Sequence, residues 1–569
     1  LTAIRQEDLQ HGTNAAYVYG CVCSDCRAQQ RNAGQCGSAM ENSSGRVVGT
    51  GSFGPWIRTV VLWASGSEGD IDRSSLSNDR KVRVMTAGNI AIDEDHLILM
   101  ERLSAQDLMN LWPDEFGWPM DLGALAILDG TQLIDTDGRF KIETAREAIA
   151  RRLHLVPRFR QQLYTPRRGL GGPLWVDAQH FDLAAQIGVF PVPPPAGEAQ
   201  LLLAVERLRA RQLDRSRPLW EMWFLPGLPQ HRVGVFIRMH HTVADGTAGV
   251  ALLGTLLDQQ ANPLTEPVPS WTPAPLPSTR ELLQDAMRSR LRAAERLLRA
   301  LGHPLDTTRR VQRAWPSARV GITDSRAPQT SLNRRIGVHR TITIIRCRLD
   351  LAKQIAHAHE AKVNDVLLAA VAGGLRQLLG GRGEPVDGVV LRAFVPVSLH
   401  HEQGGQARGN QDATMIASLP IGEPDPVRRL QLIATTTAER KKRTRSPGIN
   451  AFPNGVVQRM AWRMAAHQHF MNLSVTNVPG PPRALYLAGA ELLEVFPVIP
   501  ISVNLTLGVG ALSYNGQFNI TAVADRDACP DVSIFANGVQ ETLRALARST
   551  AAVTSATVVP GYGTARSSV

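Results

Sequence analysis

The chain of 569 residues lacks any long apolar run. No window approaches the roughly 20 near-continuous apolar residues that cross a bilayer, and the first residues do not follow the basic-then-apolar order of a secretory signal. We therefore expect the protein to stay in the cytoplasm, either free or on a membrane surface. Cysteines are also few, six in all, and four of them crowd near the start. A disulfide framework is not expected in a chain of this size without an export signal.

Acidic residues are outnumbered, with 51 Asp and Glu against 62 Lys and Arg and a net charge of +11. Such a balance favours anionic partners, for example nucleic acid, an acidic membrane surface or a phosphorylated cofactor. Codon usage in a high-GC genome, which inflates arginine, explains the composition equally well. Because no nucleic-acid-binding motif accompanies the charge, we do not expect a nucleic acid partner.

Residues 1–99 differ in composition from the rest of the chain, being rich in Cys, Gly and Ser without a sustained hydrophobic period. This composition predicts an extension with little regular structure. Its cysteines make only a weak zinc candidate, because the spacing Cys-x-Cys-x-x-Cys is irregular; they are Cys21, Cys23, Cys26 and Cys36. Met100 opens the run Met-Glu-Arg-Leu-Ser, which has the character of a native start. We hypothesise that residues 1–99 come from an over-extended start assignment.

From residue 100 onward the sequence predicts two halves of mixed α/β layers, because strand and helix patterns alternate in both. We expect an N-terminal half at 100–275, a linker and basic crossover helix at 276–332, a C-terminal half at 333–548 and a disordered tail at 549–569. In the first half the predicted strands are 123–128 and 233–239, and the predicted helices are 142–155, 201–213 and 247–259. In the second half the predicted strands are 341–349, 389–397, 414–419, 473–476, 503–507 and 517–523, and the predicted helices are 363–379 and 532–547.

Two adjacent histidines follow the strongest predicted strand, residues 233–239. The residue after a strand lies at a sheet edge, where side chains reach a cleft. Histidine titrates near neutrality, so it can take a proton from a hydroxyl and return one to a leaving group. Asp245 is placed to orient an imidazole or anchor the loop, and Gly246 permits a tight backbone path. His240, His241, Asp245 and Gly246 therefore form a candidate catalytic centre.

The pair has two alternative interpretations besides catalysis. The histidines are either buried core residues or ligands of a metal ion. The four fixed letters of His-His-x-x-x-Asp-Gly arise by chance in a chain of this length on the order of once in a thousand chains. Adjacent histidines diverge on a strand, and no His-x-x-x-His partner lies nearby, so a metal site is disfavoured. We expect no metal in this part of the chain.

The run His240-His241-x-x-x-Asp245-Gly246 resembles the signature of the chloramphenicol-acetyltransferase-like superfamily. Further blocks make residues 100–547 resemble the bacterial wax ester synthase/diacylglycerol acyltransferase family. The blocks are Leu103-Ser104 with Asp107 and Trp112, Pro218-Leu219-Trp220-Glu221, Asn364-Asp365-Val366, Val395-Pro396-Val397-Ser398, Gly409-Asn410 and Asn477-Val478-Pro479-Gly480-Pro481. The resemblance implies an α/β fold of two chloramphenicol-acetyltransferase-like halves, each a mixed sheet with packed helices, joined by a helical crossover, with the active site in the channel between them. Gln186 departs from the pattern, since the family usually has a histidine there.

The resemblance also implies a reaction. Acyl-CoA, as a substrate and not a tightly bound cofactor, donates a fatty acyl group to diacylglycerol or a long-chain alcohol, which gives triacylglycerol or wax ester and free CoA. His241 carries over as the general base for direct attack on the thioester, without a covalent enzyme intermediate. Asp245 is implied to hold the loop through an arginine, and His240 to help position that loop.

Two motifs of the resemblance have alternative roles. Asn364 is either the donor to the oxyanion or, with Asp365, a cap that satisfies helix N–H groups. Pro218, Leu219 and Trp220 pack either an acyl tunnel or the core, and core packing is the safer interpretation.

Residues 281–301 predict a basic amphipathic helix. It lies either on an acidic membrane or lipid-droplet surface or between the two halves as the crossover, which we favour. Two other functions remain open: a condensation-type acyltransferase that uses carrier-bound thioesters, and a degenerate lipid-surface protein without turnover. The C-terminal blocks favour the lipid family over the first, and the intact histidine pair speaks against the second.

Overall fold

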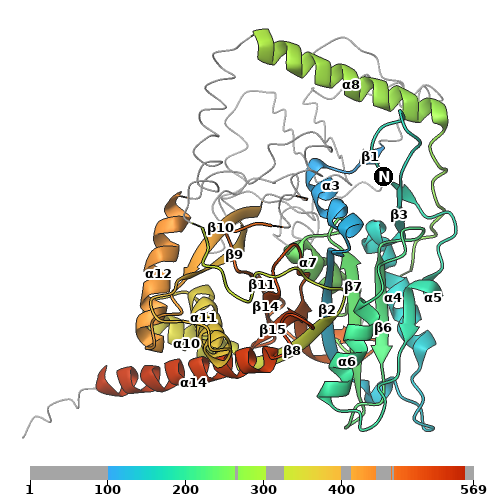
Figure 1. Ribbon diagram of the computed structural model, residues 1–569. Helices are drawn as coiled ribbons and strands as arrows, with labels where there is room; N and C mark the ends of the chain where they lie inside the picture. Colours follow the sequence, from blue (N-terminus) through green and yellow to red (C-terminus); the bar gives the residue numbers. More distant parts are fainter. Residues whose placement is uncertain are drawn as a thin grey trace, which may run out of the picture. The chain divides into compact units, whose positions relative to one another are not determined.

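The computed structural model describes residues 100–262, 267–302, 326–398, 412–443, 463 and 467–557 (Figure 1). All of these belong to one compact unit. The extension 1–99, with its zinc candidate and the start-site hypothesis, lies outside the described residues, as does the Gly409-Asn410 block.

The first sheet carries the histidines. Its six strands lie in the order β12 (Tyr486–Leu487), β13 (Ala490–Val498), β2 (Asp121–Asp129), β7 (Arg232–His240), β6 (Trp220–Leu225) and β5 (Ile187–Val189). β7 is antiparallel to both β2 and β6. Every residue of β7 after Arg232 is buried, as the continuous apolar run in the sequence predicts for a strand covered on both faces. The histidines therefore stand at the end of a rigid central strand.

Two strands of this sheet come from the second half of the sequence. β13 pairs with β2, from Leu492 opposite Leu128 to Val498 opposite Gly123. We predicted neither β12 nor β13, and the contiguous halves expected from the sequence do not include this exchange. The exchange joins the two halves through main-chain hydrogen bonds.

The second sheet also has six strands, in the order β10 (Asp412–Leu419), β9 (Leu391–Ser398), β11 (Leu473–Pro479), β14 (Leu507–Tyr514), β15 (Gln517–Asp525) and β8 (Arg340–Arg348). Four helices accompany it: α10 (Leu349–Ala358), α11 (Val363–Gly381), α12 (Pro426–Arg443) and α14 (Val532–Thr557). α11 is buried without interruption from Asp365 to Leu375 and forms the centre of the largest hydrophobic core. Both sheets with their helices confirm the mixed α/β class with two sheet-containing halves.

Two sequence predictions in this half are wrong. The strand predicted at 503–507 begins only at Leu507, because Val503 turns the chain with a φ of 57°. The true strand, β14, is rich in glycine; a Cβ on Gly508 would lie 2.8 Å from Ile501, so the preceding turn packs directly on its backbone. The tail predicted to be disordered from 549 begins instead as helix, since α14 continues to Thr557. Thr550 is 8% exposed and its hydroxyl donates to the Leu546 carbonyl.

A smaller sheet consists of β1 (Glu101–Arg102), β4 (Leu174–Asp177) and β3 (Gln161–Tyr164), and α8 (Thr279–Gly302) packs on it through Leu282. The other helices are α3 (Ala105–Leu111), α4 (Ile142–Arg152), α5 (Leu183–Gln186), α6 (Glu198–Arg209) and α7 (Gly246–Leu256). The helices predicted at 142–155, 201–213, 247–259 and 281–301 are confirmed with shifted ends. In the described part of the chain, none of the helices is both long and apolar enough to span a membrane.

Candidate active site

Main-chain hydrogen bonds hold the histidine pair at the end of β7. The His240 N–H donates to the Leu219 carbonyl at 2.9 Å, and the His241 N–H donates to the Met120 carbonyl at 2.8 Å. The chain then turns, with the Val243 N–H bonded to the His240 carbonyl. The pair is therefore fixed between the start of β6 and the residue that precedes β2.

The His240 ring is 1% exposed, and both of its nitrogens are engaged. Its Nδ1 lies 3.2 Å from the Thr242 N–H, which donates to it, and 2.8 Å from the Thr242 hydroxyl. Because Nδ1 accepts, the ring proton is on Nε2, which lies 3.2 Å from the carboxylate of Asp114. A ring with both nitrogens occupied positions the turn and is not free to exchange protons with a substrate.

Asp114 connects His240 to the residues around it. Its carboxylate also accepts from Arg215 at 3.0 Å and from the Met120 N–H at 3.2 Å. Burial raises the pKa of Asp114, but the hydrogen bonds of His240 and Arg215 and the charge of Arg215 outweigh it and leave the pKa below its usual range. The residue therefore stays ionised. Sequence reasoning missed Asp114, which lies in a 3-10 turn, Trp112–Phe116, directly after α3.

The His241 ring is partly buried and differs from that of His240. Burial lowers its pKa, and the neighbouring His240 lowers it further, whereas a hydrogen bond to its own backbone and the charges of Asp245 and Asp107 raise it. The net direction is downward, so the ring is neutral at physiological pH. Its Nδ1 lies 3.3 Å from Nδ2 of Asn110. A neutral imidazole on a fixed turn has the protonation state that a general base requires.

Asp245 is the N-cap of α7, and in the part of the chain that the structure describes no arginine pairs with it, whereas the resemblance implied such an arginine. Its carboxylate accepts from the Ala248 N–H at 2.7 Å and from the Thr247 hydroxyl at 3.0 Å. Among the described residues these are its hydrogen-bond partners, and they make it the N-cap of α7. The physical reason is local: a helix that starts one residue after the turn leaves N–H groups that this carboxylate satisfies.

Gly246 is the first residue of α7, and it brings a block from the second half of the chain close to the histidines. A Cβ on Gly246 would lie 3.4 Å from Cγ2 of Val478, which belongs to β11. The Asn477-Val478-Pro479 block therefore packs against the end of the histidine turn.

Pro218, Leu219 and Trp220 are buried, and the last two belong to hydrophobic core clusters. The Trp220 ring is fully buried, stacks on Phe159 at 4.5 Å between centroids, and donates to the Phe159 carbonyl. Gln186, where the sequence departs from the family pattern, donates to the carbonyls of Pro218 and Trp220. It thus secures the start of β6, the strand beside the histidines.

Asp365 and Asn364 lie in the first turn of α11. Both carboxylate oxygens of Asp365 are engaged, by the Lys362 N–H at 2.9 Å and by the Thr437 hydroxyl at 2.7 Å. Asp365 is thus the third residue of a capping box and joins α11 to α12, a structural role. Asn364 is partly buried, and its role as oxyanion donor stays a prediction.

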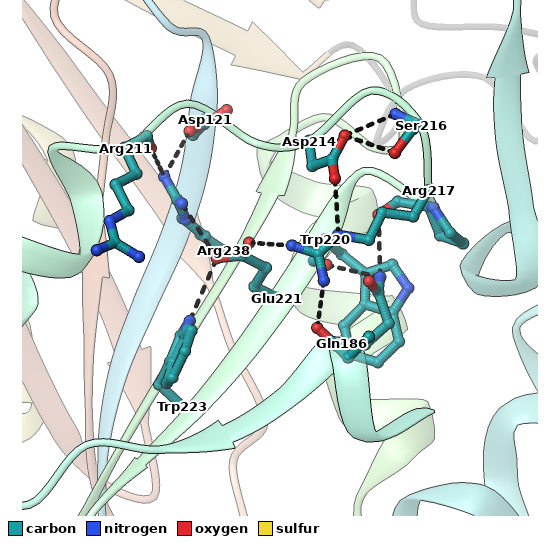
Figure 2. A network of polar contacts seen from close by, with 12 residues as sticks. Asp121, Gln186, Arg211, Asp214, Ser216, Arg217, Trp220, Glu221, Trp223 and Arg238 are labelled. Atoms are coloured by element: carbon teal, nitrogen blue, oxygen red, sulfur yellow. Dashed lines mark hydrogen bonds and ion pairs between the residues drawn. The ribbon is translucent and has the colours of Figure 1, made fainter. Parts of the chain in front are cut away.

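A buried cluster of charges lies on β7 two residues before His240 (Figure 2). Arg238 is 1% exposed and lies between two carboxylates, 3.1 Å from Asp121 and 3.0 Å from Glu221. Burial raises the pKa of Asp121, although Arg238 opposes that rise. Sequence reasoning also missed this cluster, for which the signal was a charge inside an otherwise apolar strand. In the described ranges, no group of three or more His, Cys, Asp or Glu side chains is arranged to hold a metal ion.

Two family descriptions match this chain. The wax ester synthase/diacylglycerol acyltransferase catalytic domain matches residues 103–367, and the C-terminal domain of the same family matches residues 408–547. A probable diacylglycerol O-acyltransferase of Mycobacterium tuberculosis is 29% identical over 440 residues, which cover 75% of this chain and 90% of that protein. A relative from Mycobacterium bovis with the same enzyme name is 30% identical over 473 residues, 78% of this chain and 90% of its own.

Solved structures show the same fold. A wax ester synthase/diacylglycerol acyltransferase from Marinobacter aquaeolei superposes with a TM-score of 0.58 at 23% identity, over 79% of this chain and all of that one. A trichothecene 15-O-acetyltransferase from Fusarium sporotrichioides superposes with a TM-score of 0.52 at 12% identity, over 78% of this chain and 95% of that one. At these identities the likeness concerns the fold.

Proposed function

Because this chain belongs to the wax ester synthase/diacylglycerol acyltransferase family, we propose that it moves a long-chain fatty acyl group from acyl-CoA to a lipid hydroxyl. The chain is an acyltransferase, and its named relatives are diacylglycerol O-acyltransferases. Those names support diacylglycerol as the acceptor, and the family description supports a long-chain alcohol as a second one. Acyl-CoA enters this scheme as a substrate, and the scheme uses no tightly bound cofactor.

The observation that carries the proposal is the difference between the two histidine rings. His240 is locked between Asp114 and Thr242, whereas His241 is partly buried, neutral and contacted at Nδ1. We assign the role of general base to the His241 ring. It takes the proton of the acceptor hydroxyl as that oxygen attacks the thioester carbonyl carbon. The new C–O bond forms, the C–S bond breaks, and the imidazolium returns the proton to the leaving thiolate.

The oxyanion that forms during attack requires a hydrogen-bond donor. Asn364 remains our candidate, because its neighbour Asp365 already makes the structural bonds of the helix start. That division leaves the Asn364 amide available for a ligand. Asp365 has no place in the chemistry.

From the sequence we favoured α8 as a crossover between the halves; because it carries an exposed apolar strip, we now propose that it attaches the enzyme to an anionic lipid surface. Leu282 and Ala286, which are 2% and 3% exposed, lie on its docked face. On another face Leu283, Met287, Leu291 and Leu298 are 44%, 53%, 62% and 67% exposed. Arginines adjoin this apolar strip, as in helices that lie in a membrane interface. Attachment there would give the enzyme access to acceptors that dissolve in lipid.

The test of the reaction is a product assay. The full chain receives radiolabelled palmitoyl-CoA together with either a diacylglycerol or hexadecanol, and lipid products are separated and counted. We expect labelled triacylglycerol, wax ester or both. A chain that makes neither, but transfers the acyl group when the donor is a carrier-protein thioester, is a condensation-type enzyme and contradicts the proposal.

A further inference from the structure

The basic turn, residues 167–172, lies beside α8 and is held there by Arg102. The Arg102 Nε donates to the carboxylate of Asp285, a residue of α8, at 2.5 Å. Its Nη2 donates to the Leu170 carbonyl at 2.9 Å, and its Nη1 donates to the Gly172 carbonyl. A single guanidinium, on a side chain that is only 18% exposed, therefore holds the helix and the turn together.

Packing and backbone shape support this arrangement. Leu170 packs on the small hydrophobic cluster that includes Leu282 of α8. Gly171 has a φ of 96°, and a Cβ on it would lie 2.5 Å from the Arg102 guanidinium. Only glycine combines this backbone conformation with so close an approach. The basic turn is therefore fixed relative to the docked part of α8.

Arg290 places the basic turn along one border of the exposed apolar strip of α8. Its guanidinium donates to the Gly169 carbonyl at 3.0 Å. Arg290 follows the buried Ala286 by four residues and the exposed Met287 by three, so on the helix it lies between the docked face and the strip. The turn that binds Arg290 therefore adjoins the strip.

The charge of this border is positive. Arg167 and Arg168 are both exposed, and the Leu170 N–H donates to the Arg167 carbonyl, which closes the turn. Residues 165–176 contain no Asp or Glu. On the other border of the strip lies the exposed Arg288, three residues before Leu291. Cations from two separate segments of the chain thus flank one apolar strip.

We propose that Arg167 and Arg168 bind the anionic headgroups of a phospholipid surface while the apolar strip of α8 enters its acyl region. The inference rests on the proposed attachment of α8 and adds a second contact, which orients the enzyme on the surface. Guanidinium groups bind phosphate oxygens well, and anionic lipid attracts cations that lie within a Debye length. A second copy of this chain fits poorly, because it would bring arginine against arginine in a protein of net charge +11.

The test is flotation of the full chain with vesicles of phosphatidylglycerol/phosphatidylcholine and of phosphatidylcholine alone. Arg167→Gln combined with Arg168→Gln removes the two charges of the basic turn. The matched control removes two charges from another exposed pair, Arg334→Gln with Arg335→Gln. We expect the first variant to bind the anionic vesicles about 10- to 30-fold more weakly than the parent, the effect of two basic residues near such a surface. On phosphatidylcholine alone it should bind as the parent does.

The outcomes separate this inference from the attachment of α8. If the basic-turn variant floats like its control while Leu291→Asp with Leu298→Asp does not, α8 binds lipid and the basic turn does not, which overturns the inference alone. If the α8 variant floats like the parent, the attachment of α8 and the inference both fail. If flotation is unchanged and the basic-turn variant instead abolishes a dimer in analytical ultracentrifugation, the surface binds a second copy and the inference is overturned.

A further variant tests the fixed arrangement with both arginines in place. Gly171→Ala forces the turn away from Arg102, and its matched control is Gly138→Ala, where φ is 77° but no atom lies within 4 Å of the added Cβ. We expect Gly171→Ala to bind the anionic vesicles about fivefold more weakly than this control, the share of one basic residue. Thermal unfolding shows that each variant folds. Equal binding of the two glycine variants contradicts a headgroup site that depends on the position of the turn.

Discussion

The carboxylate of Asp114 lies 3.2 Å from Nε2 of His240, in a place where the ring is almost fully buried. This pair fixes the first histidine from outside the strand that carries it. Because His240 is thereby held on both sides, the turn that follows presents His241 in one orientation. The two histidines of the motif thus have different tasks.

We predict that Asp114→Ala destabilises the fold and slows the enzyme. The change leaves the buried Nε2–H of His240 without its partner, which costs about 1 to 3 kcal/mol of unfolding free energy. The turn loosens, so kcat should fall more than KM changes. Chemical denaturation and steady-state kinetics measure both effects.

The control is Asp137→Ala, since the Asp137 side chain is 69% exposed. It should leave both quantities unchanged. If Asp114→Ala unfolds at the same denaturant concentration as this control, His240 does not depend on Asp114.

The N-cap role of Asp245 makes a separate prediction. Asp245→Ala should cost about 1 kcal/mol of unfolding free energy, because the first N–H groups of α7 lose their acceptor. Asp245→Asn keeps the cap and should retain most of the stability and activity. An Asp245→Asn variant as impaired as Asp245→Ala would show that the negative charge matters beyond the cap.

The buried cluster around Arg238 should be among the most sensitive sites of the fold. Arg238→Met removes the cation between Asp121 and Glu221, which costs about 3 to 5 kcal/mol because the buried Asp121 loses its ion-pair partner, while Glu221 keeps its contact with Arg217. The combined change with Asp121→Asn and Glu221→Gln removes those charges and should recover part of the loss. Denaturation midpoints of the single and triple variants test this. A triple variant less stable than Arg238→Met contradicts the account.

The lipid attachment of α8 is tested by flotation with vesicles. Leu291→Asp combined with Leu298→Asp should reduce binding to phosphatidylglycerol/phosphatidylcholine vesicles at least about tenfold, because each leucine loses the free energy of apolar burial. Leu155→Asp, at another site that is 49% exposed, is the matched control. Equal flotation of the double variant and the control would show that this face of α8 does not bind lipid.

The sequence predicted the parts of this fold that depend on continuous patterns. The apolar run before His240 predicted β7, and amphipathic periodicity predicted α8. It did not predict that β13 joins the first sheet, because strand partners far apart in the chain leave no local signal. The start of β14 was also missed, since its glycines accommodate the turn at Val503 and weaken the strand pattern.

The residues of the candidate site also fall into those that the sequence predicts and those that it does not. His240 and His241 were found because a motif names them. Asp114 and Asn110 were missed because they come from a different segment and meet the histidines only in the folded chain. Asp245 was found, but its bond to the Ala248 N–H was not predicted, since this bond follows from where α7 begins.

The most direct test of the account is the rate of ester formation by His241→Gln at saturating palmitoyl-CoA and acceptor. The account predicts that kcat falls by about 10²- to 10⁴-fold, the contribution of a general base, while unfolding stability stays near that of the parent. His339→Gln, an exposed histidine on the approach to β8, should retain the parental rate. If His241→Gln forms ester as fast as the parent, His241 is not the base and the central claim is contradicted.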